Sequence, residues 1–180
     1  MNHFTRWAKR GNNGWSFILV LVPAGVLFVF LFPYLFLTAL PRLDARLGLP
    51  SLSFGPVNWI LGGILLLLGM VYASWSICMQ VYKASGTPVP IVPTQKLLVS
   101  PPFSHCRNPM VFGTICAYLG LAILARSISS IILVGIFTAS LVLYIKKVEE
   151  NELVMRFGEE YLEYKSRTPF LIPRITRKSK

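Results

Sequence analysis

Residues 109–145 read PMVFGTICAYLGLAILARSISSIILVGIFTASLVLYI, two apolar runs that only Arg126 separates. An α-helix rises about 1.5 Å per residue, so a hydrocarbon core about 30 Å thick needs roughly 20 apolar residues. Backbone groups inside lipid must pair within their own segment. The two runs are therefore predicted to be transmembrane helices joined by a tight hairpin, with Ser127 as the N-cap of the second.

Two longer apolar runs come before this hairpin. Residues 15–40 and 54–82 contain no Lys, Arg, Asp or Glu, and each is long enough to cross a bilayer with some tilt. The first run exceeds the 7–15 apolar residues of a signal peptide, which favours a retained span. Pro23 and Pro33 predict kinks in this run. A fifth span or a re-entrant segment is an alternative interpretation of the same run.

These runs together predict an all-α fold. We expect an integral membrane bundle of four transmembrane helices, followed by a cytosolic amphipathic helix, in a single domain. The predicted spans are residues 15–40, 54–82, 109–125 and 127–145, and the predicted cytosolic tail is residues 146–180. Small residues at Gly113, Ala117 and Gly120, and at Gly135 and Ala139, mark helix faces where a neighbouring helix could approach closely.

The composition agrees with a membrane protein. Hydrophobic residues make up 54% of the chain and charged residues 14%, where a soluble domain has about 25% charged residues. This excludes a disordered chain, a coiled coil and an ordinary soluble enzyme. Cys78, Cys106 and Cys116 are scattered and form no CxxC pair, so neither a disulfide framework nor a metal site is expected.

The basic residues predict the orientation. The formal net charge is +11, with 18 Lys and Arg. With four spans, the N-terminus, the loop over residues 83–108 and the tail share the side that holds most of these residues, and this side is cytosolic by the positive-inside rule. The membrane would be the cytoplasmic membrane of a bacterium or the endoplasmic reticulum of a eukaryote. The surplus charge favours anionic lipid headgroups as partners, and no nucleic-acid motif is present.

The first polar stretch on this side is a proline-rich loop that ends at Arg107, Asn108 and Pro109. Asn108 is a good N-cap, and Pro109 suits the first helical position because its missing N–H would be unpaired anyway. The helix N-terminus and Arg107 together favour an anionic or hydrogen-bond-accepting ligand. The alternative is a capped helix whose Arg reaches lipid headgroups.

The second polar stretch follows the last span. Leu153, Phe157 and Tyr161 recur at helical spacing, which predicts an amphipathic helix that continues from the span, with Gly158 as an interruption. Adjacent carboxylates at a membrane boundary, Glu149-Glu150, are costly unless a cation meets them or water solvates them. The candidate cations are Lys146, Lys147, Arg107 and a positively charged ligand.

Both stretches resemble a known family. The run Glu149-Glu150-x-x-Leu153-x-x-x-Phe157-Gly158-x-x-Tyr161-x-x-Tyr164-x-x-Arg167-x-Pro169-x-x-x-Pro173 resembles the C-terminal signature of isoprenylcysteine carboxyl methyltransferases. The other half of that signature is similar to Gly86-Thr87-Pro88-x-Pro90 followed by Arg107-Asn108-Pro109-Met110-x-x-Gly113. The Arg-Asn-Pro-Met form is typical of bacterial members of the wider group, which includes phospholipid methyltransferases.

The resemblance implies an integral membrane methyltransferase that uses S-adenosylmethionine and no metal. It implies a cofactor site at the cytosolic face, formed by Arg107, Asn108, Pro109, Gly113, Glu149 and Glu150. The acceptor would be a lipophilic or lipid-linked carboxylate or amine that enters from the bilayer. A carboxylate needs no base, whereas an amine must lose a proton, for which Glu149, Glu150 or His105 are candidates, and of these we expect catalytic roles for Glu150 and His105.

Two departures from the family pattern keep an alternative open. Pro101-Pro102-Phe103 stands where many relatives have Gly-Pro-Tyr, and Val111 stands where a Tyr is common. They favour a non-catalytic membrane scaffold of the same family. A soluble dinucleotide-type methyltransferase is excluded, because no strand is followed by a glycine-rich turn and a helix. A transporter would be expected to carry ionisable residues within its spans, and these spans have none.

Overall fold

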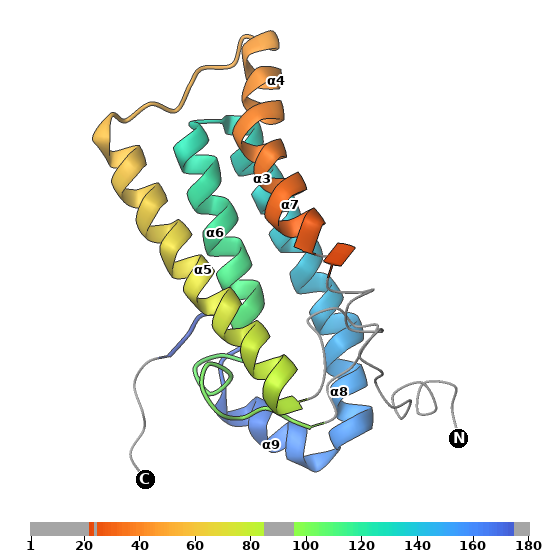
Figure 1. Ribbon diagram of the computed structural model, residues 1–180. Coiled ribbons are helices and arrows are strands. Elements are labelled where there is room, and N and C mark those ends of the chain that lie inside the picture. The colour runs from red at the N-terminus through yellow and green to blue at the C-terminus, as the bar shows by residue number, and fades with distance from the viewer. Residues whose placement is uncertain (1–21, 24, 85–95, 175–180) are drawn as a thin grey trace.

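The computed structural model describes residues 22–23, 25–84 and 96–174, and the regular secondary structure in this part of the chain is entirely helical. Three helices are long and apolar enough to cross a membrane: Val26–Arg46, Pro56–Ala84 and Ile128–Phe157. A shorter apolar helix, Pro109–Ala125, lies among them (Figure 1). The all-helical prediction is confirmed for the described residues, and three such helices indicate an integral membrane protein. Residues 15–21 of the first predicted span and the Gly86–Pro90 motif lie outside the described residues.

The first long helix is built from four segments: η1 (Val26–Leu31), α3 (Phe32–Tyr34), η2 (Leu35–Ala39) and α4 (Leu40–Arg46). Pro33 lies in α3, between the two π-helical segments. A proline removes one backbone donor, and wider turns are a common way for a helix to accommodate that loss. The predicted end of this helix at residue 40 is wrong, because the helix continues through Pro41 to Arg46.

Helices α5 (Pro56–Ala84) and α6 (Pro109–Ala125) pack against each other closely and run antiparallel. A Cβ atom added to Gly113 would lie 2.5 Å from the Ala73 nitrogen, and one added to Gly120 would lie 2.7 Å from the Gly62 oxygen. The prediction of a close approach at Gly113 and Gly120 is confirmed, with α5 as the partner. At Gly135, by contrast, an added Cβ would have no atom of another described element within 4 Å.

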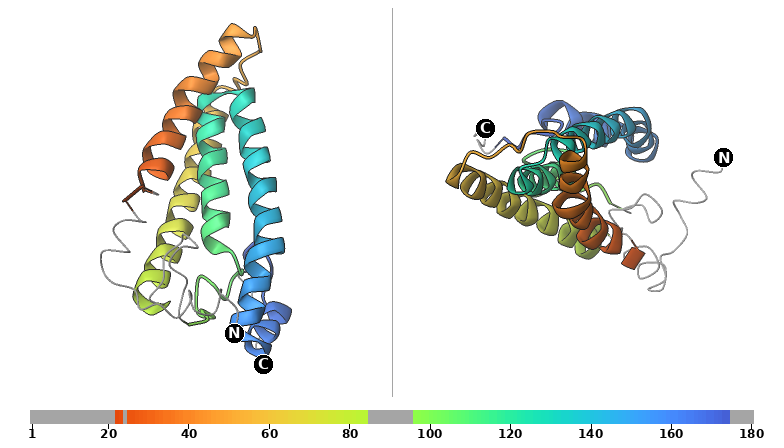
Figure 2. Two further views of the ribbon diagram at one scale, coloured as in Figure 1. Left: turned by 90° about the vertical axis from the view of Figure 1, so that its right-hand side faces the viewer. Right: turned by 90° about the horizontal axis from the view of Figure 1, so that it is seen from above.

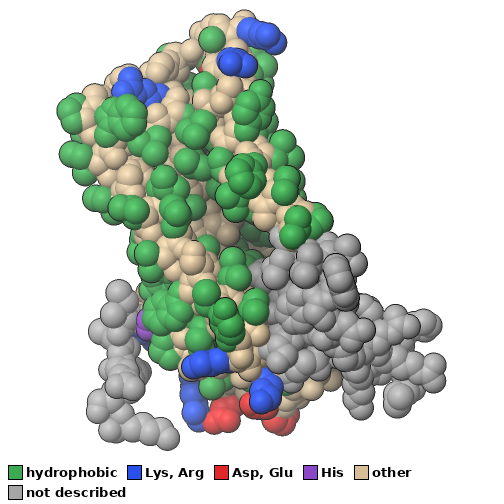
Figure 3. All heavy atoms as spheres, viewed as in Figure 1, with side chains coloured by type: hydrophobic (Ala, Val, Ile, Leu, Met, Phe, Trp, Pro, Cys, Tyr) green, Lys and Arg blue, Asp and Glu red, His purple; other side chains and the backbone are tan. Residues whose placement is uncertain are grey.

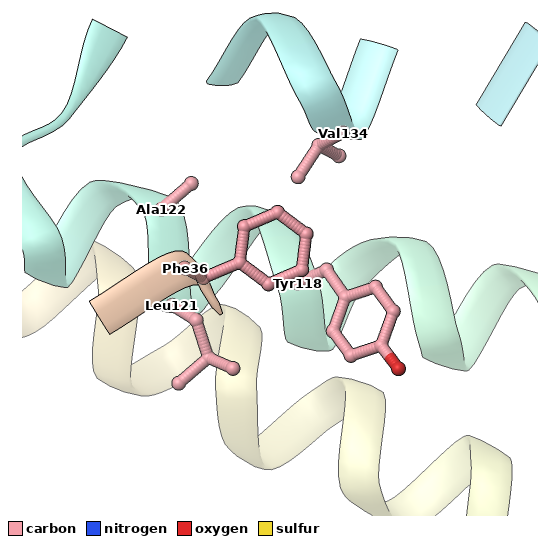
Figure 4. Close-up of a cluster of buried hydrophobic side chains, with 5 residues drawn as sticks. All are labelled: Phe36, Tyr118, Leu121, Ala122 and Val134. Atoms are coloured by element: carbon pink, nitrogen blue, oxygen red, sulfur yellow. The ribbon is translucent and has the colours of Figure 1, made fainter. Parts of the chain in front are cut away.

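The hydrophobic core joins the first helix to α6 and to α7 (Ile128–Tyr144). It consists of the buried side chains of Phe36, Tyr118, Leu121, Ala122 and Val134 (Figure 4). Polar atoms beside this cluster are satisfied by backbone oxygens. The Tyr118 hydroxyl donates to the Phe28 carbonyl at 3.1 Å, and the Ser130 hydroxyl donates to the Phe36 carbonyl at 3.0 Å.

The hairpin between α6 and α7 turns at Arg126, which adopts the left-handed conformation with φ of 55°. Ser127 caps α7 as predicted, and its hydroxyl accepts from the Ser130 N–H at 3.1 Å. The carboxylate of Asp44 also lies at this helix N-terminus. It accepts from the Ser127 hydroxyl at 2.6 Å and from the Ser129 N–H at 3.2 Å. Asp44 therefore ties the end of α4 to the start of α7.

Replacing Asp44 with alanine should lower thermal stability. The change removes two hydrogen bonds to a carboxylate and a favourable charge at a helix N-terminus, together worth about 1–3 kcal/mol. We expect a lower Tm in detergent, measured by loss of the monodisperse peak on size-exclusion chromatography after heating. Asp44→Asn keeps an oxygen for the Ser129 N–H and should give an intermediate Tm. A wild-type Tm for Asp44→Ala would contradict this role.

At the other end of the molecule, α7 continues without a break through η3 (Ile145–Glu149) into α8 (Glu150–Phe157). Thirty helical residues rise about 45 Å, more than the thickness of a hydrocarbon core, and the charged residues of this helix begin at Lys146. Gly158, with φ of 54°, ends α8, and α9 (Glu159–Arg167) turns across the end of the bundle (Figures 1 and 2). The predicted continuation and its interruption are confirmed. Figure 3 shows an apolar band between two ends that carry charged side chains.

Candidate functional site

The loop before α6, residues 96–108, is held by the C-terminal segment, residues 168–174. The Arg107 N–H donates to the Pro169 carbonyl at 2.8 Å, and the Arg174 N–H donates to the His105 carbonyl at 2.9 Å. The Tyr164 hydroxyl of α9 donates to the Phe103 carbonyl at 2.6 Å. These bonds fix the backbone on which Arg107 stands.

Asn108 occupies the N-cap position of α6, but its side chain does not cap the helix. The side-chain amide instead donates to the Phe170 carbonyl at 2.9 Å. The predicted capping by Asn108 is therefore wrong, since the C-terminal segment offers this amide an acceptor that the sequence does not reveal. Pro109 stands at the first helical position, as predicted.

Arg107, Glu150 and Lys165 form a charged cluster at this end of the bundle. Glu150 accepts from Arg107 Nη1 at 2.5 Å through Oε1 and from Lys165 Nζ at 2.7 Å through Oε2. The Arg107 and Glu150 side chains are 11% and 10% exposed. Tyr161 accepts a longer bond from Arg107 Nη1 at 3.4 Å, and the Phe170 ring lies 5.5 Å from the Arg107 guanidinium. Both oxygens of Glu150 are in ion pairs, so its carboxylate is held in one position. Its bond to Arg107 Nη1 therefore fixes the orientation of the guanidinium.

Arg107 is among the cations predicted for the glutamate pair, and the structure pairs it with Glu150. Lys165 was not predicted, and it lies fifteen residues after Glu150 on a different helix. The contact depends on the angle that the chain takes at Gly158. Gly158 indicates in the sequence that the chain turns there, but the residue type does not determine the angle between α8 and α9.

A cavity of about 670 Å³ opens beside this cluster. It extends from the loop before α6 up between the first helix, α5, α6 and α7. Its charged lining residues belong to the loop before α6, to η3 and to α8, and most of its other lining residues are apolar. The predicted site residues that line it are Arg107, Asn108, Glu149 and Glu150.

Glu149 is the carboxylate of the cavity that lacks an ion-pair partner among the described residues. Burial, together with the nearby carboxylates of Glu152 and Glu150, raises the pKa of Glu149 to about 7. A carboxylate in this state is neutral for part of the time near pH 7, and a cation placed beside it would ionise it fully.

Two buried side-chain atoms have no hydrogen-bond partner in the part of the chain that the structure describes: Arg107 Nε and Gln80 Oε1. Both residues line the cavity. A buried polar atom without a partner is uncommon in native proteins and is costly unless a ligand or water meets it. Gln80 was not predicted from the sequence, where the available signal was a polar amide in the last turns of a predicted span.

Three predicted site residues do not line the cavity. His105 packs against Trp75 and Tyr72, with the Tyr72 hydroxyl 3.5 Å from its Nδ1. Pro109 is buried at the start of α6, and Gly113 contacts α5. The geometry gives Gly113 a role in helix packing, and a cofactor role for it, like a catalytic role for His105, stays a prediction.

The family model described as phospholipid methyltransferase matches residues 57–160. The chain belongs to the phospholipid methyltransferase family. The matched region begins with α5 and includes Arg107, Asn108, Glu149 and Glu150, so the resemblance found in the sequence to this wider group is confirmed.

One relative of this phospholipid methyltransferase family member is the cobalt-zinc-cadmium resistance protein CzcN of Cupriavidus metallidurans. It is 28% identical over 141 residues, which are 75% of this chain and 62% of CzcN. The chain thus spans less than two thirds of the length of that relative. No solved structure matches the chain.

Proposed function

We propose that this protein transfers a methyl group from S-adenosylmethionine to a lipophilic carboxylate or amine at the cytosolic membrane face. The observation that carries the proposal is the cavity lined by Arg107, Glu149 and Glu150, in a member of a methyltransferase family. The whole chain would form a single methyltransferase domain.

The proposal includes a membrane orientation. All four apolar helices cross the bilayer, with the short helix α6 enclosed among the longer ones, and both termini lie on the cytosolic side with most of the basic residues. The membrane is the bacterial cytoplasmic membrane or the endoplasmic reticulum. The polar end of the cavity then faces the cytosol, where a polar donor enters, and its apolar end lies at membrane depth, where a lipophilic acceptor enters. Anionic headgroups attract the basic tail.

The residues present fit the cofactor chemically. S-adenosylmethionine supplies a methyl group already activated on a sulfonium, and it also carries an ammonium and a carboxylate. Among the described residues, the buried Nε–H of Arg107 has no partner, which suits a carboxylate, and Glu149 has no ion-pair partner, which suits a cation. Glu150 and Lys165 hold Arg107 in place, and Asn108 holds the loop through Phe170.

The chain contributes mainly by alignment. Holding donor and acceptor in a reactive geometry can lower a barrier by about 7–11 kcal/mol. Apolar side chains of the upper cavity, such as Phe28 and Met70, keep water away from an apolar acceptor. For an amine acceptor, Glu149 is placed to take the proton, because a carboxyl with a pKa near 7 is effective as a general base at neutral pH. Both oxygens of Glu150 are already in ion pairs.

The direct test combines binding and turnover. We expect S-adenosylhomocysteine to bind the detergent-purified protein, measured by calorimetry, and labelled methyl from S-adenosylmethionine to appear in an added lipid extract. A folded protein that binds no S-adenosylhomocysteine would contradict the proposal. It would favour the non-catalytic scaffold, with Val111, which lines the cavity, and the loop at Pro101–Phe103 as the altered positions.

The affinity for S-adenosylmethionine should rise as the pH rises through 7. The cationic ligand favours the ionised form of Glu149, whose pKa in the free protein is about 7, so binding at lower pH requires a proton to leave. The expected slope is up to about tenfold in affinity per pH unit between pH 6 and pH 7. Calorimetry at several pH values measures this, and Glu149→Gln should flatten the slope. A slope that persists in Glu149→Gln would assign it to another group.

The ligand-free protein should show the opposite trend. The folded-state pKa of Glu149 lies above the ordinary value of 4.5, so the folded state binds more protons than the unfolded state between those values. This contribution to stability is complete below about pH 4.5 and is lost as the pH rises through 7. A comparison of Tm between wild type and Glu149→Gln from pH 5 to pH 8 isolates it, because the variant lacks the titrating group.

A further inference from the structure

Gln80 is an unexplained polar residue of the cavity. Its Oε1 atom is buried and has no hydrogen-bond partner among the described residues. It stands near the end of α5, within an otherwise largely apolar helix. The family motifs found in the sequence begin at residue 86 and do not include it, although it lies within the region that the family model matches.

The register between α5 and α6 brings Gln80 to the level of Arg107. Gly113 faces Ala73 across the antiparallel pair. Gln80 lies seven residues beyond Ala73, about 10 Å along the helix, and Arg107 lies a similar distance before Gly113 in the same direction. Both side chains line the same cavity, and both carry a buried atom without a partner.

The two atoms have complementary requirements. Arg107 Nε–H is a donor, and Gln80 Oε1 is an acceptor. One ligand group that presents both an acceptor and a donor could satisfy both. An α-amino-acid group does so, with a carboxylate for Arg107 and an ammonium for Gln80, and the methyl donor of the proposed function carries such a group.

We propose that Gln80 and Arg107 together hold the α-amino-acid group of the methyl donor, with the Arg107 Nε–H donating to its carboxylate and the Gln80 Oε1 accepting from its ammonium. This inference rests on the proposed function. It fixes the orientation of the bound methyl donor in the cavity, because its amino-acid group would lie between α5 and the loop before α6. It also leaves the carboxylate of Glu149 free for the sulfonium or for the acceptor.

The test measures the affinity of two ligands for each of four proteins. The ligands are S-adenosylhomocysteine and its analogue without the amino group, titrated by calorimetry. The proteins are wild type, Gln80→Met, Gln80→Glu and the control Tyr82→Phe, which removes an exposed hydroxyl two residues away. Gln80→Met should weaken S-adenosylhomocysteine binding about tenfold or more and leave binding of the analogue within about twofold, because only the first ligand offers the ammonium. Gln80→Glu keeps an acceptor and should retain S-adenosylhomocysteine binding, and Tyr82→Phe should match wild type.

Other outcomes overturn the inference in distinguishable ways. Wild-type affinity for S-adenosylhomocysteine in Gln80→Met would remove Gln80 from the site while the proposed function stands. An equal loss for both ligands would assign Gln80 to another part of the ligand or to the fold, and would also overturn the inference. Absence of S-adenosylhomocysteine binding by the wild type would overturn the proposed function, and the inference with it.

Discussion

Glu150→Ala is expected to abolish measurable S-adenosylhomocysteine binding and to destabilise the protein by about 3–5 kcal/mol. The carboxylate holds Arg107 at 2.5 Å and Lys165 at 2.7 Å, and the Arg107 side chain is only 11% exposed. Its removal leaves a buried guanidinium without a counter-ion, and the guanidinium then loses its fixed orientation towards the cavity. Calorimetry and thermal unfolding of the same preparation measure the two effects.

A double variant separates binding from stability. Arg107→Met combined with Glu150→Leu removes both buried charges, so it should recover much of the lost stability but none of the binding. Glu150→Gln retains the shape and one acceptor and should fall between wild type and Glu150→Ala in both measurements. If Glu150→Ala binds S-adenosylhomocysteine as wild type does, the charged cluster is not part of the cofactor site.

Gly69→Val is expected to cause the largest loss of folded protein. A Cβ atom at this position would lie 2.5 Å from the Gly113 oxygen and would also meet backbone atoms of Ala117, so α5 and α6 would have to separate. Backbone contacts of this kind cannot be relieved by a rotamer change, and overpacking costs about 1–3 kcal/mol even where side chains can adjust. The fraction of monodisperse protein after membrane extraction, and its Tm, report the loss.

Gly63 offers a matched control on the same helix. Apart from the backbone of its own helix, no atom of the described residues lies within 4 Å of a Cβ added there. Gly63→Val should therefore leave the yield and the Tm close to those of wild type, although the residue type and the secondary structure are the same. An equal loss at both positions would attribute the effect to the β-branched residue in the helix and not to the contact with α6.

The ends of the helices were predictable from the sequence where a charged residue interrupts an apolar run. The run ending before Arg126 and the cap at Ser127 give the hairpin directly, because lipid excludes unpaired charges and Ser127 can bond the free N–H of Ser130. The end of the first helix was not predictable in this way. Pro41 and Arg42 are typical of a loop, but Asp44 binds the N-terminus of α7 and the helix continues to reach it.

The candidate site was predictable in part. Arg107 and the glutamate pair stand out because charges at a membrane boundary need partners. Lys165 and Gln80 did not stand out, since their places depend on the turn at Gly158 and on the packing register of two helices. The side chain of Asn108 was assigned to the wrong partner, because the carbonyl to which its amide donates, that of Phe170, lies more than sixty residues later in the chain.

The hydrogen bonds from the loop before α6 to the C-terminal segment also set an order of assembly during synthesis. Arg107 and Asn108 are bonded to the backbone oxygens of Pro169 and Phe170, and Arg174 is bonded back to His105. Residues 169–174 leave the ribosome only after every apolar helix has been made. The helices can therefore insert and pair while the loop still lacks these partners, and the site is completed last. A chain released before Pro169 would keep its membrane helices but would lack the backbone bonds that hold Arg107.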